Sequence, residues 1–160
     1  MRTFRQTLLG CGIIFLAIQF VRPPKNSAAG PDPRDILVHH PAPPAVQEIL
    51  RNACYDCHSN TTRYPWYAEI QPFSWWLATH INDGKKHLNF SAFFDYSTKR
   101  ADHKLEEAAE EVLAGKMPLP SYTLAHPEAR LSPEQIQALT TWITSVRSRI
   151  LSAAPEHDTP

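Results

Sequence analysis

The five residues Cys54-Tyr55-Asp56-Cys57-His58 constrain the fold and function of this 160-residue chain more than any other feature. Residues three and four positions apart lie on one face of a helix, so Cys54, Cys57 and His58 can all point at the same object. Cys-x-x-Cys-His is the pattern of c-type haem attachment. Each thiol can form a thioether with one haem vinyl group while the imidazole of His58 binds the iron. The motif therefore predicts one haem c, held covalently by Cys54 and Cys57.

Other uses of the two cysteines need partners that the sequence lacks. A structural zinc site takes four ligands, but the third cysteine of the chain, Cys11, lies in an apolar run. A thioredoxin-like pair belongs to a βαβ unit, and no convincing strand pattern occurs here. A disulfide between Cys54 and Cys57 would close too small a loop to stabilise the fold much.

Net charge and the distribution of aromatic residues narrow the class of protein further. The 16 Lys and Arg residues balance the 16 Asp and Glu residues, so we predict no nucleic-acid partner. Aromatic side chains crowd into the stretch after the motif, which suits the wall of a large flat ligand, although an ordinary aromatic core is the alternative. Arg63, Tyr64 and Trp66 are candidate donors to the haem propionates. The candidate cofactor-binding residues of this stretch are Tyr64, Trp66, Trp75 and Trp76.

Residues 1–22 have the form of a signal sequence or membrane anchor. Arg2 and Arg5 precede an uncharged, largely apolar run, and basic residues in this position keep the N-terminus in the cytoplasm. We expect an uncleaved anchor helix, with Cys11 as a free thiol inside it. The rest of the chain would then be periplasmic and attached to the inner membrane. Export followed by cleavage near Ala29 is the alternative.

A proline-rich linker is predicted over residues 23–44. Seven of the 15 prolines lie there, and repeated proline prevents helices and favours a stiff, extended chain. We expect this linker to hold the domain off the membrane as a semi-rigid spacer. The haem c-binding domain is predicted to occupy residues 45–151, followed by a polar tail at 152–160.

Apolar residues recur with helical spacing through much of the domain. The first helix is predicted to begin near Pro44 and to carry the cysteine motif on its last turns. A second helix is predicted over 72–83 with Gly84 as its stop, and a third over about 102–114 with Gly115 as its stop. The domain is therefore expected to be all-α.

Blocks of sequence around the motif resemble a known family, the haem-binding domain of small bacterial c-type cytochromes. The similar blocks are CYDCHSNTTRYPWY (54–67), IQPFSWWLATHI (70–81), HLNFS (87–91), KMPLPSYTLAHPEARLS (116–132) and the closing helix with Trp142. Together they cover most of residues 45–150. The resemblance implies a cytochrome c-like helical fold around one haem c, with a methionine as distal ligand.

The last helix has clear signals at its start. Ser132-Pro133-Glu134-Gln135 is a capping box with proline at the first helical position. Apolar residues then repeat along one face of the helix. Because the terminal helices cross each other in a cytochrome c fold, we expect this face to pack on Val46 and Leu50.

Met117 is the predicted distal ligand. It is the only methionine besides Met1 and is followed by Pro118, and cytochrome c domains use a loop methionine of this kind to bind the iron. Methionine as a core filler is the alternative. The rival distal ligands are His80, His126 and His103. On the proximal side, the other ring nitrogen of His58 should donate to a backbone carbonyl in the loop between Pro65 and Pro72, as ligating histidines usually do.

These observations predict a periplasmic, membrane-tethered c-type cytochrome that transfers electrons. Methionine ligation raises the reduction potential, which suits a carrier with a redox partner protein or respiratory complex. The alternative is a haem-based gas or redox sensing module that acts with a partner protein. We expect no enzymatic activity, since a peroxidase would need a second haem or an open distal site with acid–base groups.

Overall fold

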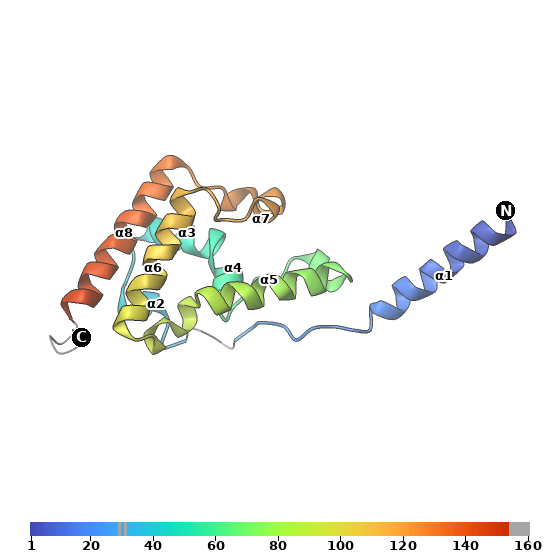
Figure 1. Cartoon of the computed structure of the whole chain (residues 1–160), viewed down its shortest axis with the longest axis horizontal. Helices are drawn as coiled ribbons and strands as arrows, with labels where there is room; N and C mark the ends of the chain where they lie inside the picture. The colour runs from blue at the N-terminus through green and yellow to red at the C-terminus, as the bar shows by residue number, and fades with distance from the viewer. Residues whose placement is uncertain (29, 31, 154–160) are drawn as a thin grey trace.

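The computed structural model describes residues 1–28, 30 and 32–153, in which the chain folds into helices (Figure 1). In chain order the elements are α1 (Arg2–Ile18), α2 (Ile36–His39), α3 (Pro44–Ala53), α4 (Tyr55–His58), η1 (Trp66–Glu69), α5 (Phe73–His87), η2 (Phe90–Asp95), α6 (Thr98–Leu113), α7 (Pro120–Ala125), η3 (Pro127–Ala129) and α8 (Pro133–Ser152). Within the described ranges the only β feature is a single antiparallel bridge between Ser27 and Thr61. The all-α prediction is therefore confirmed. Most of the predicted tail at 152–160 lies outside the described residues.

The core of the domain forms where α3, α6 and α8 pack together. α6 and α8 lie side by side (Figure 1), and Leu105 of α6 and Val146 of α8 are fully buried. Val46 and Leu50 of α3 belong to the same buried cluster as Leu139 and Val146. The prediction that the last helix packs on Val46 and Leu50 is therefore confirmed.

Capping interactions set the ends of the two long helices. The predicted capping box of α8 is present: Ser132 Oγ accepts from the Gln135 N–H at 3.3 Å, and Gln135 Oε1 accepts from the Ser132 N–H at 2.9 Å. α6 begins earlier than predicted because Ser97 caps it, accepting from the Arg100 N–H at 3.4 Å. Gly115 follows the end of α6 with a φ of 67°, a conformation that glycine adopts without strain.

Helix α5 continues through Gly84, where the sequence predicts its end. A Cβ atom on Gly84 would lie 2.7 Å from the carbonyl oxygen of Cys57, so only glycine allows α5 to pack this closely on α4. The predicted stop is wrong because the glycine serves a close approach between two helices, which the local sequence does not reveal. The helix ends at His87 instead.

The N-terminal helix α1 projects from the domain, and none of its residues is buried (Figure 1). Among the helices of the described ranges, α1 included, none combines the length and apolar character needed to cross a membrane. The membrane-spanning segment predicted over 1–22 is therefore not found in the structure.

The described residues of the proline-rich segment 23–44 bond with the domain and do not hold it at a distance as the predicted semi-rigid spacer would. The Asn26 side chain donates to the carbonyl of Ser59 at 2.8 Å. Asp35 caps α2 and accepts a hydrogen bond of 2.8 Å from the hydroxyl of Tyr55 in the cysteine motif. Repeated proline disfavours long helices, and the segment contains only the four residues of α2 and the first residue of α3 in helical form within its described part. Polar groups around the prolines bond with the folded domain instead.

Candidate functional site

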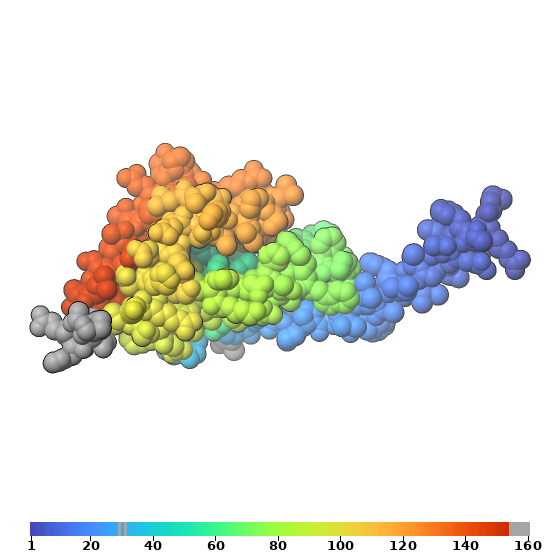
Figure 2. All heavy atoms as spheres, in the orientation of Figure 1, coloured from blue at the N-terminus to red at the C-terminus, as the bar shows by residue number. Residues whose placement is uncertain are grey.

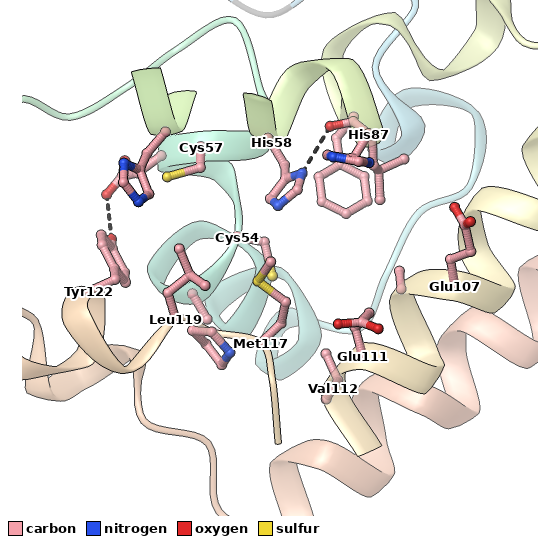
Figure 3. A pocket seen from close by; sticks show the side chains of 18 of the residues that line it. Cys54, Cys57, His58, His87, Glu107, Glu111, Val112, Met117, Leu119 and Tyr122 are labelled. Carbon is pink, nitrogen blue, oxygen red and sulfur yellow. Dashed lines mark hydrogen bonds between the residues drawn. The ribbon is translucent and has the colours of Figure 1, made fainter. Parts of the chain in front are cut away.

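A cavity of about 600 Å³ opens between α4, α5, α6 and the loop that precedes α7. Ligand pockets typically enclose about 300–1,000 Å³, so the cavity has room for a large ligand. Figure 2 shows the molecular surface hollowed between α5 and α7, and Figure 3 shows the side chains around the cavity. Apolar residues such as Leu88, Phe90, Val112 and Leu119 contribute to the wall. The predicted haem-binding residues that line it are Cys54, Cys57, His58 and Met117.

The cysteine motif is bent at its first residue. α3 ends at Ala53, and Cys54 has a φ of −128° and a ψ of −46°. The single turn of α4 follows, in which the N–H groups of Cys57 and His58 donate to the Cys54 carbonyl at 3.2 and 2.9 Å. The motif therefore does not continue the first helix as predicted. The short turn nevertheless brings both cysteines and the histidine to one cavity.

His58 is held by a carbonyl group at the end of α5. Its Nδ1–H donates to the carbonyl oxygen of Leu88 at 2.9 Å (Figure 3), which leaves Nε2 with a free lone pair, the form in which histidine binds a metal. Leu88 has extended backbone angles just after α5, so its carbonyl is free to accept. A carbonyl partner is as expected, but its predicted location between Pro65 and Pro72 is wrong. The real location depends on how α5 packs on α4.

The surroundings of His58 and the two thiols disfavour the charged forms of all three groups. Burial is the largest influence that lowers the pKa of His58. Burial also raises the pKa of Cys54 to about 12 and that of Cys57 to about 11. Zinc binds thiolates, and no group of three or more His, Cys, Asp or Glu side chains within the described ranges could hold a metal ion. This donor set therefore fits thioether attachment, in which an S–H group adds across a vinyl group, better than a zinc site.

A buried carboxylate lies inside the motif, next to the cavity. Asp56 is only 6% exposed, and its Oδ2 accepts a hydrogen bond of 2.7 Å from the Tyr122 hydroxyl. Its Oδ1 accepts from the backbone N–H of Arg63 at 3.0 Å and from Nε of the same residue at 3.2 Å. Burial and the bond to Asp56 raise the pKa of Tyr122, so its phenol keeps the proton that it donates.

Sequence reasoning missed this network, and one of its members has a different role from the predicted one. Asp56 and Tyr122 are 66 positions apart, so no local pattern connects them. Arg63 is a predicted propionate donor, but its guanidinium binds Asp56 and also donates to the Arg51 carbonyl at 2.7 Å. The arginine therefore stabilises the motif from outside.

The four aromatic candidates do not line the cavity, although the ring of Trp76 packs on that of His80, which does, with 4.2 Å between the ring centroids. These candidates are Tyr64, Trp66, Trp75 and Trp76. The Tyr64 hydroxyl accepts from a backbone amide of the N-terminal segment at 2.6 Å, and the Trp75 indole donates to a backbone carbonyl of the same segment at 2.8 Å. Trp66 is 78% exposed and Trp76 is 45% exposed. Because none of the four belongs to the cavity wall, their positions do not support the predicted role in binding the cofactor.

The cavity offers more than one candidate for a distal ligand. Met117 lines it and also packs against the buried core. His80 lines it as well, and its Nδ1–H donates to a carbonyl one turn earlier in α5 at 2.9 Å. His87, which sequence reasoning missed, is a third candidate ligand that lines the cavity, whereas His126 and His103 do not line it. The geometry therefore brings Met117 and its main predicted rival, His80, to the same site.

Comparison with known proteins supports the resemblance found in the sequence. A family model described as a haem-binding domain matches residues 13–145. No curated protein and no solved structure matches the chain at a significant level. The matched range contains the complete cavity wall, and the apolar cavity with its thiols and imidazole fits a haem. The chain belongs to the haem-binding domain family.

Proposed function

We propose that this protein is a c-type cytochrome that binds one haem c through Cys54 and Cys57 and transfers electrons. The proposal rests on one observation. Both thiols, the His58 imidazole and the Met117 thioether line a single cavity. The haem supplies an iron centre that is oxidised and reduced by one electron.

The residues of the chain bind, orient and shield that centre. His58 would bind the iron through Nε2, because the Leu88 carbonyl fixes its ring orientation and holds its proton on Nδ1. Met117 would supply its thioether to the iron, and methionine ligation would raise the reduction potential. The apolar side chains of Phe90 and Val112 limit the access of water to the site, which also favours a higher potential.

Extraction with acid and acetone tests covalent attachment. We expect the haem to stay on the protein, and the mass of the intact chain to exceed that of the polypeptide by one haem. C54A and C57A should each weaken attachment, because each removes one thioether. The matched control is C11A, which changes the exposed cysteine of α1. Recovery of free haem in the organic phase from the unmodified protein contradicts the proposal.

Binding of carbon monoxide to the reduced protein distinguishes electron transfer from sensing. A six-coordinate iron with a firmly held methionine resists the gas, so we expect slow and incomplete binding. Rapid and complete binding to the unmodified protein favours the alternative, a sensing module whose distal ligand is displaced.

We further propose that the protein is periplasmic and attached to the inner membrane through α1, where a redox partner protein or respiratory complex exchanges electrons with it. The basic residues Arg2 and Arg5 lie in the first turns of the helix. Its large apolar side chains are uncovered: Leu9 is 65% exposed, Ile13 60% and Leu16 64%. Exposed apolar side chains in such number indicate a contact surface. Lipid is the partner that fits an apolar helix with basic residues at its start.

Fractionation of cells tests this attachment. Membranes washed in high salt should retain the protein, and detergent should release it with its N-terminal residues intact. A mature N-terminus near Gly30 indicates export and cleavage instead.

A further inference from the structure

Three large aromatic side chains in η1 and at the start of α5 are open to solvent. Trp66 is 78% exposed, Phe73 55% and Trp76 45%. Phe73 and Trp76 are three positions apart on α5 and so share a face of that helix, and η1 packs against α5. We call these three residues the aromatic face. Large apolar side chains gathered at one end of a domain indicate a contact surface.

The end of α1 is hydrogen-bonded to the same region. The Gln71 N–H donates to the side-chain oxygen of Gln19, and Gln71 Nε2 donates to the Val21 carbonyl, each at 2.9 Å. The Trp75 indole donates to the same carbonyl at 2.8 Å. Figures 1 and 2 show the segment after α1 running beside the start of α5. The apolar helix α1 is therefore joined to the domain in the region of η1 and the start of α5.

The charges where the segment after α1 meets η1 suit an anionic surface. Arg22 and Lys25 both pair with Glu69 of η1, so two cations meet one carboxylate. Lys25 also lies over the ring of Tyr64, 5.4 Å from its centroid. An excess positive charge next to an apolar helix attracts anionic lipid headgroups.

From these contacts we infer that the aromatic face lies in the headgroup region of a lipid bilayer. Tryptophan favours this region because its ring is apolar while its N–H group can hydrogen-bond. The inference rests on the proposed membrane attachment of α1 and extends it. α1 alone would attach the domain to the membrane without fixing its orientation. The aromatic face, together with the bonds from Gln71 and Trp75, also sets the orientation of the domain on the membrane. A bilayer is the occupant because the apolar helix α1 and the cations Arg22 and Lys25 are joined to the same region of the domain that carries the aromatic face.

Nuclear magnetic resonance of the full, reduced protein in lipid nanodiscs tests the inference. The probe is a lipid that carries a spin label near its headgroup. We expect the indole N–H signals of Trp66 and Trp76 to broaden several-fold more than that of Trp142, which is 5% exposed in the core. The amide signals of Gly10 and Gly12 in α1 report separately whether α1 is in the bilayer.

A double variant and a matched control complete the test. W66A/F73A should reduce the broadening of Trp76, because two of the three lipid contacts are removed. F94A should leave it unchanged, since Phe94 is similarly exposed, at 59%, but lies in η2 outside the aromatic face.

The outcomes distinguish a failure of this inference from a failure of the proposed membrane attachment of α1. One outcome is that the signals of Gly10 and Gly12 broaden while those of Trp66 and Trp76 broaden no more than that of Trp142. In that case α1 is attached but the aromatic face does not contact lipid, and the inference is wrong. If none of these signals broadens, the membrane attachment itself is wrong. A dimer in detergent that W66A/F73A dissociates shows that a second copy covers the aromatic face, which also overturns the inference. Haem content, read from the absorption spectrum, is independent of all three results.

Discussion

The hydroxyl of Tyr122 donates a hydrogen bond of 2.7 Å to the buried carboxylate of Asp56. Asp56 lies between the two cysteines of the motif, and Tyr122 lies on α7, shortly after Met117. Arg63 binds the same carboxylate from the other side, with 3.2 Å between Nε and Oδ1. This bond therefore ties the segment that carries the proposed distal ligand to the segment that carries the proximal one.

Y122F should loosen the Met117 loop. A hydrogen bond to a charged group contributes about 1.5–3 kcal/mol, so we expect the free energy of unfolding in urea to fall by about this amount. Carbon monoxide should also bind the reduced variant faster. Y67F is the control, since it removes a hydroxyl that bonds to His126 at 3.0 Å without contacting Asp56. Equal rates of gas binding in Y122F and the unmodified protein contradict the conclusion that the Tyr122–Asp56 bond holds the Met117 loop in place.

M117A should remove the sixth iron ligand. A thioether–iron bond gives the oxidised protein a weak far-red absorption band, and this band should disappear. The reduction potential should fall and carbon monoxide should bind readily, because methionine ligation raises the potential and blocks the iron. H80A is the matched control at the other candidate and should leave all three properties nearly unchanged. If H80A is instead the variant that loses its sixth ligand, the protein is a bis-histidine cytochrome of lower potential.

G84A should destabilise the domain even though alanine favours helices. The new Cβ would lie 2.7 Å from the Cys57 carbonyl oxygen, and overpacking of this kind costs about 1–3 kcal/mol, which exceeds the gain of about 1 kcal/mol in helix propensity. Because α5 would be displaced from α4, we also expect less haem per chain. Thermal unfolding and haem quantification measure the two effects. The control is G12A in α1, where nothing lies within 4 Å of the new Cβ; equal behaviour of the two variants would refute the close-packing argument.

The stability of the domain should rise with pH in part through His40. Burial, with the charges of Arg149 and His39 as smaller influences, lowers the pKa of His40. The unfolded chain therefore binds more protons at this site than the folded one, so its contribution is fully present above the ordinary histidine pKa of about 6.5 and is lost as the pH falls through the lower folded-state value. Urea unfolding of H40N should show a smaller loss of stability between about pH 7.5 and about pH 5 than the unmodified protein. An identical loss of stability in H40N and the unmodified protein would contradict the assignment of this pH dependence to His40.

Much of the secondary structure and the centre of the site could be predicted because the signals are local. Three features depend on residues within a few positions of each other or on the helical period. They are the start of α3 at Pro44, the capping box of α8, and the apolar stripe of α8 that packs on Val46 and Leu50. The spacing of Cys54, Cys57 and His58 depends on a single turn. These parts of the fold need no knowledge of distant segments.

Aromatic residues close to the motif in sequence need not be close to the cavity in space. Trp66 and Trp76 follow the motif closely, yet the chain turns them to solvent, and the direction of that turn depends on how η1 and α5 pack on the N-terminal segment. Composition identified an aromatic-rich stretch but not the side on which it lies. The same limit applies to Arg63, whose partner is the motif itself.

The sequence by itself determined the chemistry at the attachment site, because two thiols and an imidazole within five residues can act together only in a short turn. Only the tertiary structure decided which distant groups complete the site. The Leu88 carbonyl reaches His58, Gly84 admits the backbone of Cys57, and the Tyr122 phenol closes on Asp56. Each of these contacts joins residues that are far apart along the chain, and their meeting depends on how α5 and α7 pack around the motif, which no local pattern of residues encodes.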